Sequence, residues 1–221
     1  MISIKNFTKS YADKTVYENF NLEIKEEGIT CILGESGCGK TTLLNAVAGL
    51  IDYGGEITKK RVSYVFQTPR LIPNLTVGEN LKFIGADSNR AAYMLERVGL
   101  TYKKDSYPNS LSGGEAQRVS LVRAFCFRSD VLLMDEPFSS LDLKTKLSVM
   151  ELFKSMCKEE QRGAVFVTHD IDEALYLADR ILVMRGGSII NDLTNQNKGE
   201  FGANSPLREQ IIKALLYVET E

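Results

Sequence analysis

One stretch of the chain indicates the fold most directly: Gly34-Glu35-Ser36-Gly37-Cys38-Gly39-Lys40-Thr41. It follows the apolar run from Ile29 to Leu33 and precedes a helical pattern from Lys40 to Ala48, the context that a phosphate-binding loop requires. Its glycines let backbone N–H groups curl around phosphate oxygens, and its lysine can reach the β and γ phosphates. The Thr41 hydroxyl suits Mg²⁺, and Thr42 continues the helix beside it. A turn with only a structural role would seldom carry lysine and threonine here, so the stretch predicts a P-loop NTPase core.

The apolar pattern around this stretch predicts an α/β fold with a parallel sheet. Strands that are apolar on both faces suit the centre of such a sheet, and helical patterns follow several of them. The predicted strands are Ile29 to Leu33, Val62 to Val65, Val131 to Met134, Ala164 to Val167 and Ile181 to Met184, and the helices are Lys40 to Ala48, Leu143 to Glu160 and Asp170 to Leu177. Alternating apolar residues in Ile2 to Phe7 and in Phe20 to Ile24 predict an antiparallel β edge.

Between Gln67 and Asp130 the pattern changes to helices alone, which predicts an inserted helical subdomain. Its best segments are Val77 to Phe83, Ala91 to Val98 and Glu115 to Phe127. We expect a single domain over 1–221, with an α/β core of residues 1–67 and 131–200, a helical subdomain of residues 68–130 and a C-terminal helical segment of residues 201–221. Gly186-Gly187 predicts a hairpin turn, and an amphipathic helix is predicted from Pro206 to Val218.

A second motif, Val131-Leu132-Leu133-Met134-Asp135-Glu136-Pro137, is an apolar strand that ends in two acids. Parallel α/β sheets bind ligands at the carboxyl ends of their strands, so both carboxylates are expected at the binding edge. Asp135 suits the Mg²⁺ shell. Successive side chains of a strand diverge, so Glu136 should face differently and could orient or deprotonate the attacking water. Alone, such a pair would more often be a solvated turn; beside the phosphate-binding loop it predicts catalysis.

Composition and charge restrict the class of protein. The chain has 221 residues, 43% of them hydrophobic and 25% charged, which is ordinary for a folded globular protein. Lys and Arg number 27 against 29 Asp and Glu, so the formal charge of -2 gives no reason to expect a nucleic-acid surface. The cysteines Cys31, Cys38, Cys126 and Cys157 lack metal-ligand spacing and suit a reducing compartment, and Cys38, at a predicted helix start beside Lys40, is expected to ionise readily. No secretory signal and no run of about 18 apolar residues occurs, so a cytoplasmic protein is expected.

A third motif, Leu111-Ser112-Gly113-Gly114-Glu115-Ala116-Gln117-Arg118, decides which kind of NTPase this is. It resembles the signature sequence of the ABC ATPase family, and the resemblance covers nearly the whole chain. Ser112 can cap a helix whose first N–H groups are left bare by Gly113 and Gly114, which makes a second anion-binding element. The resemblance implies that the chain binds and hydrolyses ATP with Mg²⁺.

The same resemblance implies roles for further residues. Tyr11 resembles the aromatic residue that stacks on adenine, and Gln67 the glutamine that senses Mg²⁺ and water. Ser139-Ser140-Leu141-Asp142 is similar to the loop that crosses the dimer interface, although Asp142 could also cap the following helix. His169, the only histidine, resembles the switch histidine at the γ-phosphate. The implied catalytic set is Glu136, His169, Lys40 and Gln67, and the implied metal ligands are Thr41, Gln67 and Asp135.

The family implies partners as well. ABC ATPases work as dimers, of identical chains or with a paralogous subunit, on the inner face of the membrane beside separate transmembrane permease subunits. Import would also involve an extracytoplasmic solute-binding protein. Two segments, Phe66-Gln67-Thr68-Pro69-Arg70-Leu71-Ile72-Pro73-Asn74-Leu75-Thr76-Val77 and Thr168-His169-Asp170-Ile171-Asp172-Glu173-Ala174, are similar to the nitrate, sulfonate and taurine importer ATPases of bacteria. Import is therefore favoured, with the lipoprotein-releasing and peptide-exporting types as the alternative.

Two other classes of protein compete with a transporter subunit. An ABC ATPase that acts on DNA or ribosomes would call for long coiled coils or a second cassette, and the sequence shows neither. A GTPase or small-molecule kinase shares the phosphate-binding loop, and Asn197-Lys198-Gly199-Glu200 resembles a guanine-reading motif. That segment ends in Glu where Asp is expected, so we interpret it as a surface loop. We expect no regulatory domain after the cassette.

Overall fold

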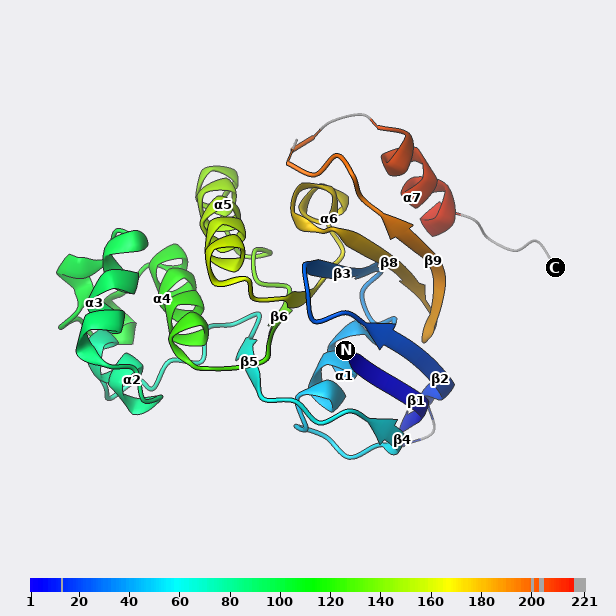
Figure 1. The fold of residues 1–221 in the computed structure, drawn as a ribbon, viewed down its shortest axis with the longest axis horizontal. Coiled ribbons are helices and arrows are strands. Elements are labelled where there is room, and N and C mark those ends of the chain that lie inside the picture. The colour runs from blue at the N-terminus through cyan, green and yellow to red at the C-terminus, as the bar shows by residue number, and fades with distance from the viewer. Residues whose placement is uncertain (13, 200, 203–204, 217–221) are drawn as a thin grey trace. The chain divides into compact units, whose positions relative to one another are not determined.

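The computed structural model of the chain describes residues 1–12, 14–199, 201–202 and 205–216 (Figure 1). The chain divides into two compact units, the first made of residues 1–60 and 163–221 and the second of residues 61–162. The second unit is therefore one continuous segment, whereas the first is assembled from both ends of the chain. The subdomain limits at residues 68 and 130 and the assignment to a single domain stay predictions.

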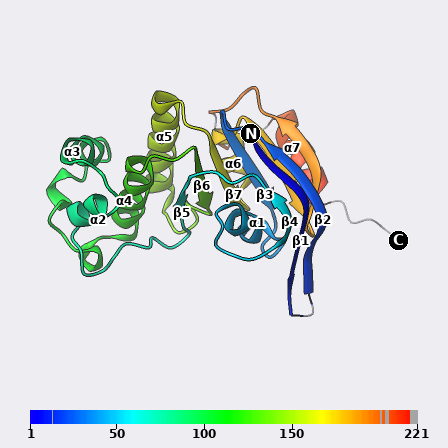
Figure 2. The ribbon, with the colours of Figure 1, turned by 60° about the horizontal axis from the view of Figure 1, so that its bottom comes forward.

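The first unit contains a three-stranded antiparallel sheet in the order β2–β1–β4. Its strands are β1 (Ile2–Tyr11), β2 (Lys14–Ile24) and β4 (Gly54–Ile57). Ile2, Ile4 and Phe7 of β1 are buried, and Ile2 lies opposite Ile24 of β2. Figure 2 shows β1 and β2 side by side as one long ribbon. This sheet is the antiparallel edge that the alternating pattern predicts, and β4 is a strand that the pattern does not predict.

A second sheet of the first unit is built around β3 (Ile29–Gly34). β3 pairs in parallel with β7 (Ala164–Thr168) and with β8 (Arg180–Arg185), and β9 (Ser188–Thr194) pairs antiparallel with β8. Every residue of β3 and β7 is buried, as expected for strands covered on both faces. The β8–β9 turn holds Gly186 and Gly187 at φ values of 49° and 78°, which glycine adopts readily, so the predicted hairpin is confirmed.

Three helices of the described chain belong to the first unit. They are α1 (Lys40–Val47), α6 (Ile171–Leu177) and α7 (Pro206–Leu216). Figure 1 shows α1 on the side of the second sheet that faces β1, β2 and β4, with α6 and α7 on the opposite side. An ion pair between Arg208 and Asp172 joins α7 to α6, and Arg185 of β8 donates to the Leu215 carbonyl of α7 at 3.0 Å. The predicted end of this helix, Val218, lies outside the described residues.

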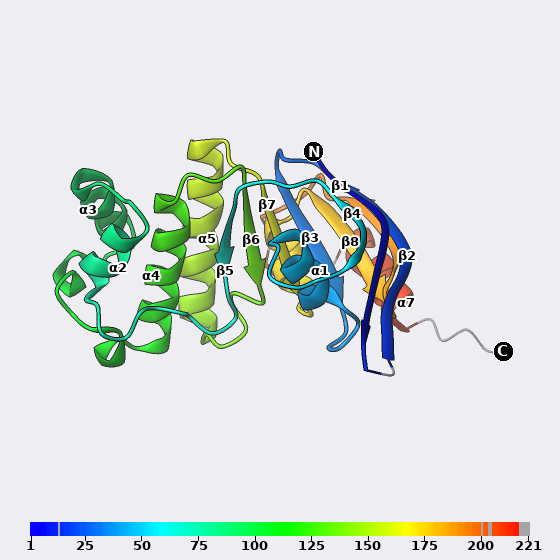
Figure 3. The same cartoon turned by 90° about the horizontal axis from the view of Figure 1, so that it is seen from below.

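The second unit combines two parallel strands with four α-helices. The strands are β5 (Val62–Val65) and β6 (Val131–Asp135), the α-helices are α2 (Val77–Phe83), α3 (Ser88–Arg97), α4 (Gly113–Cys126) and α5 (Leu143–Glu160), and short 3-10 helices span Thr101–Lys103 and Pro108–Ser110. Figure 3 shows α2 and α3 against one side of α4, with α5 and β5 near its other side. None of the helices in the described part of the chain has the length and apolar character that crossing a bilayer requires.

Side-chain caps set where two of these helices begin. Ser112 caps α4, which therefore starts at Gly113 and not at the predicted Glu115. Asp87 accepts a hydrogen bond from a backbone N–H of the first turn of α3, so this helix starts before the predicted Ala91. A cap residue accepts hydrogen bonds from N–H groups that have no partner within the helix. A capped helix can therefore begin with a polar turn, and a prediction based on apolar periodicity misses such a turn.

Candidate functional site

The predicted phosphate-binding loop connects β3 to α1 in the first unit. Gly37 and Gly39 have φ values of 79° and 112°, where any other residue would strain the backbone. Gly39 is the N-cap of α1, and no side chain caps this helix start. Uncapped N–H groups at a helix N-terminus carry partial positive charge and can bind an anion. The loop therefore has the backbone geometry of an anion-binding site.

Lys40 is the first residue of α1 and is 4% exposed. Its Nζ donates hydrogen bonds of 2.8 Å to the carbonyl oxygens of Gly34 and Glu35. These bonds hold a buried positive charge against the loop backbone, where a charge requires polar partners. Thr41 beside it is exposed and Thr42 is half-buried. The structure thus gathers a lysine, two hydroxyls and a helix N-terminus without a side-chain cap at one place.

Cys38 does not have the readily ionised thiol that the sequence predicts. Burial raises the pKa of the Cys38 thiol above its ordinary value, and the nearby Lys40 charge, which acts in the opposite direction, does not offset it. The loop is also tight at this point, because a Cβ on Gly34 would lie 2.9 Å from the Cys38 Sγ. The prediction that Cys38 is a thiolate is wrong, because partial burial outweighs the helix N-terminus and the lysine.

His169 follows β7 and is exposed. The residues around it are held firmly: the Asp170 carboxylate caps α6 by accepting the Glu173 backbone N–H at 3.3 Å. The Thr168 hydroxyl donates to the buried Glu173 carboxylate at 2.6 Å. His169 is therefore an accessible side chain between two fixed elements.

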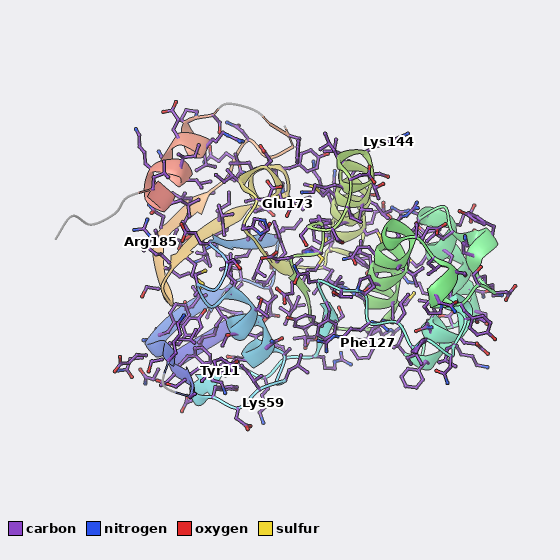
Figure 4. All side chains as sticks on the ribbon, turned by 180° about the vertical axis from the view of Figure 1, so that it is seen from behind. Tyr11, Lys59, Phe127, Lys144, Glu173 and Arg185 are labelled. Carbon is purple, nitrogen blue, oxygen red and sulfur yellow. The ribbon has the colours of Figure 1, made fainter. Side chains whose placement is uncertain are left out.

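Tyr11 lies at the end of β1, where 47% of its surface is exposed (Figure 4). The Lys9 ammonium lies 4.9 Å from the centre of its ring. The ring is accessible to a planar ligand, as the predicted stacking role requires, and that role stays a prediction.

The acidic end of β6 belongs to the second unit. Asp135 ends the strand and is 8% exposed, and the following Glu136 is half-buried. Glu136 has a φ of 41°, in the left-handed region that strains any residue other than glycine. The Gln67 amide nitrogen donates to the Glu136 carboxylate at 3.4 Å. The structure thus brings together two predicted site residues that are 69 positions apart in the sequence.

The signature stretch forms the start of α4. The Ser112 hydroxyl accepts from the Glu115 N–H at 3.3 Å, and the Glu115 carboxylate accepts from the Ser112 N–H at 2.8 Å. The hydrogen bond from the Ser112 backbone lowers the pKa of the Glu115 carboxyl. A Cβ on Gly114 would lie 2.8 Å from Thr145 of α5, whereas one on Gly113 would meet nothing within 4 Å. Packing therefore requires glycine at Gly114, and Gly113 leaves the helix start open.

The predicted interface loop, Ser139 to Asp142, connects β6 to α5. Ser139 and Ser140 are exposed, and the Ser139 hydroxyl donates to the Glu136 carbonyl at 3.0 Å. The Asp142 carboxylate accepts from the Thr145 N–H at 3.1 Å, so the predicted helix cap is confirmed. A role at a dimer interface stays a prediction.

Two buried polar side chains beside these motifs are not predicted from the sequence. Gln117 is fully buried, and its amide nitrogen donates at 2.7 Å to the Pro137 carbonyl, one residue after Glu136. Tyr17 is 1% exposed, and its hydroxyl donates at 3.0 Å to the Gly39 carbonyl. No spacing in the sequence signals either contact, because both depend on how β2 and α4 pack.

The predicted site residues fall into two groups by unit. The first unit contributes the loop from Gly34 to Thr42, Tyr11 and His169, and the second contributes Gln67, Asp135, Glu136, Ser112, Gly113 and Gly114. Chemically, the first group can bind phosphates and a planar ring, and the second can orient water and supply a carboxylate base.

Comparisons with known proteins match this combination of elements. Residues 17–139 match the family described as ABC transporter. An aliphatic sulfonates import ATP-binding protein, SsuB 3 of Paraburkholderia xenovorans, is 44% identical over 194 residues, or 85% of this chain and 78% of that protein. Another, SsuB 2 of Streptomyces avermitilis, is 39% identical over an alignment of 226 positions that covers 97% of this chain and 90% of that protein.

Solved structures show the same fold. A dimeric structure of MJ0796, described as a bacterial ABC transporter cassette, has a TM-score of 0.80 at 32% identity and covers 89% of this chain and 100% of that chain. MJ0796 in a dimeric post-hydrolysis state bound to ADP and Pi has a TM-score of 0.79 at 32% identity with the same coverage. These likenesses confirm the predicted α/β fold with a P-loop NTPase core.

Proposed function

This chain belongs to the ABC transporter family, and from that premise we propose that its ATP hydrolysis drives import of a small solute of the nitrate, sulfonate or taurine type. The chain binds ATP and is an ATPase of this family. Import is supported by the two relatives above, both of which are aliphatic sulfonates import ATP-binding proteins. The structural observation that carries the ATP-driven part of the proposal is the loop from Gly34 to Lys40, a glycine-rich turn into an uncapped helix with a buried lysine.

The proposed phosphate site is the loop from Gly34 to Thr42. Its backbone N–H groups would bind phosphate oxygens, and Lys40 would exchange a carbonyl partner for a phosphate. The exposed Tyr11 ring is proposed to stack on adenine. The helix start at Ser112, Gly113 and Gly114 is proposed to bind the phosphates of an ATP held by a second subunit, which would make ATP part of the dimer interface.

Glu136 is proposed as the general base of hydrolysis. Its carboxylate can accept the proton of the attacking water, and the hydrogen bond from Gln67 restrains its position. The left-handed backbone at Glu136 also fits a catalytic role, since such strain gathers at functional sites. His169 is proposed to contact the γ-phosphate, because it is exposed at the end of a rigid strand.

Mg²⁺ is proposed as the metal that accompanies ATP. Thr41, Gln67 and Asp135 would supply hydroxyl, amide and carboxylate oxygens, the hard donors that Mg²⁺ prefers. Among the described residues no group of three or more His, Cys, Asp and Glu could hold a metal, which agrees with an ion that takes one carboxylate and relies on phosphate oxygens. Bound Mg²⁺ would neutralise charge that develops on the phosphates.

The partners are proposed from the family and its relatives. The dimeric MJ0796 cassettes support a dimer, of identical chains or with a paralogous subunit. The import relatives support transmembrane permease subunits, an extracytoplasmic solute-binding protein and a peripheral position on the cytoplasmic face of the membrane. No nucleic-acid partner is proposed, since the formal charge is -2.

The proposal is tested by transport. The chain would be reconstituted in proteoliposomes with the permease encoded by a neighbouring reading frame, and uptake of radiolabelled taurine, an alkanesulfonate and nitrate would be measured with the solute-binding protein present. We expect uptake of one of these solutes that needs ATP on the side of this chain and is lost in Lys40→Ala. Vesicles that hydrolyse ATP but accumulate none of the three solutes would contradict the proposed import function.

A further inference from the structure

Four carbonyl oxygens of the phosphate-binding loop accept hydrogen bonds from side chains or from a segment outside the loop. The bonds run from Lys40 Nζ to Gly34 and Glu35, from the Gly187 N–H to Cys38 at 3.1 Å, and from the Tyr17 hydroxyl to Gly39 at 3.0 Å. A loop that binds anions through its N–H groups must keep its carbonyl oxygens, which repel anions, engaged elsewhere. Two of these donors, Gly187 and Tyr17, come from outside the loop and its helix.

Gly187 and Tyr17 belong to one continuous support. Gly187 lies in the β8–β9 turn and Tyr17 in β2, and a Cβ on Gly187 would lie 2.1 Å from the Val16 carbonyl. The turn and β2 therefore touch backbone to backbone beside the loop. Two consecutive loop carbonyls, those of Cys38 and Gly39, are bound by this support.

Tyr17 fits this place closely. Its ring packs edge-on against Phe7 and Phe20, with ring centres 4.9 and 5.0 Å apart. A Cβ on Gly39 would lie 2.9 Å from the Tyr17 hydroxyl oxygen, so the ring lies directly against the loop. Burial raises the pKa of Tyr17 far above its ordinary value, so the hydroxyl keeps its proton and stays a donor.

The hydroxyl is the part of Tyr17 that the aromatic cluster does not need. Besides the Gly39 carbonyl it contacts Met184 Sδ at 3.5 Å, and a thioether sulfur is a weak acceptor. A phenylalanine would make the same ring contacts with Phe7 and Phe20. The Gly39 carbonyl would not be left bare either, because it also accepts the Leu43 N–H at 3.0 Å. A hydrogen bond that neither the core nor the carbonyl requires points to a role in the orientation of the loop.

We propose that Tyr17 is a positioning residue for the nucleotide: its hydroxyl holds the last peptide of the phosphate-binding loop in the conformation that binds ATP and ADP. This inference rests on the proposed role of the loop as the phosphate site. Apparent affinity is proportional to the fraction of molecules whose site is competent. A loop that loses this bond and spends less time in the competent conformation therefore binds nucleotide more weakly, although no contact to the nucleotide is lost.

The test compares Tyr17→Phe with Tyr53→Phe. Tyr53 is a matched control, because its ring also packs on Phe7, at 5.6 Å, and it does not touch the loop in the described contacts. We expect Tyr17→Phe to raise the Kd of ATP and of ADP about three- to ten-fold, the usual range for one net hydrogen bond. Tyr53→Phe should leave both values unchanged.

A second readout needs no nucleotide. Cys38 lies in the loop and is half-buried, so its rate of reaction with a thiol reagent reports loop order, whereas the buried Cys31 and Cys157 report opening of the fold. We expect Tyr17→Phe to speed labelling of Cys38 several-fold and to leave Cys31 and Cys157 protected. A change of labelling confined to the loop is an effect that general destabilisation would not produce.

Two results for Tyr17→Phe would overturn the inference. One is unchanged nucleotide affinity together with unchanged Cys38 labelling. The other is faster labelling of Cys38, Cys31 and Cys157 alike, which would show that the role of Tyr17 is purely structural. A failure of the proposed function looks different. In that case Lys40→Ala would bind ATP as well as the parent does, and the loop would not be the nucleotide site at all.

Discussion

Glycine in place of Glu136 is expected to stabilise the fold while it ends hydrolysis. At a φ of 41° a side-chain-bearing residue is disfavoured by about 1–2 kcal/mol, and glycine is not. Glycine loses about 0.5–1 kcal/mol more backbone entropy on folding. The lost hydrogen bond from the exposed Gln67, 3.4 Å long, subtracts little. The net gain is about 0.5–1 kcal/mol, or roughly 1–4 °C in Tm for a chain of this size.

Glu136→Gln is the matched variant, because it keeps the side-chain shape and the strained backbone and removes only the basic oxygen. Its Tm should equal that of the parent, whereas both variants should lose about 10²- to 10⁴-fold in kcat, the usual contribution of a general base. ATP binding should persist in both, since the proposed phosphate contacts come from other residues. Scanning calorimetry and phosphate release, measured on the same three preparations, supply the comparison.

The expected gain in Tm and the expected loss of kcat can each be refuted separately. A Tm for Glu136→Gly at or below that of Glu136→Gln would show that the backbone at this position stores no strain. Phosphate release by Glu136→Gln within ten-fold of the parent would show that another group takes the proton of the attacking water.

Three further predictions concern the two anion-binding elements and their supports. Mixed dimers of Lys40→Ala with Ser112→Arg should occlude one ATP per dimer, because both substitutions then fall in one site and the other site is intact. If the mixed dimers trap no more ATP than the homodimer of either variant, the site is not shared between subunits. Alkylation of Cys38 should be slow near neutral pH and should still accelerate above pH 9, since the pKa of this thiol is raised, and bound ATP should protect it. An alkylation rate that no longer increases with pH above pH 7 would contradict a neutral thiol. Gln117→Leu should lower kcat several-fold with little change in ATP affinity, because it removes the hydrogen bond to the Pro137 carbonyl, one residue after the proposed base Glu136. A kcat equal to that of the parent would show that Gln117 does not position Glu136.

Local chemistry explains why much of the fold could be predicted from the sequence. The run from Ile29 to Leu33 is apolar at nearly every position, and the glycines after it permit a single kind of turn. The strand, the loop and the helix could therefore be predicted from this stretch alone, without knowledge of the segments that pack against it. The paired glycines at Gly186-Gly187 mark their turn in the same way. The contact between Gln67 and Glu136 agrees with motifs found separately along the chain.

What could not be predicted depends on packing between distant segments. The strand Gly54–Ile57 has no alternating apolar pattern and exists because β1 offers it an edge. The contact of Tyr17 with Gly39 joins residues 22 positions apart through a core that no short motif describes. The sequence neighbours of Cys38 predict a readily ionised thiol, but burial, which the sequence does not show, raises the pKa of this thiol.

The division of the first unit between the two ends of the chain sets the timing of its biosynthesis. β3 is translated early, yet its partners β7 and β8 begin only at Ala164 and Arg180. At about 5–20 residues per second, the ribosome needs on the order of ten to thirty seconds to supply them. During that interval the phosphate-binding strand, buried on both faces in the finished protein, has neither neighbour, while residues 61–162 emerge complete and can fold first. The nascent chain therefore offers this strand to chaperones, and nucleotide binding can begin only after β7 and β8 have been translated.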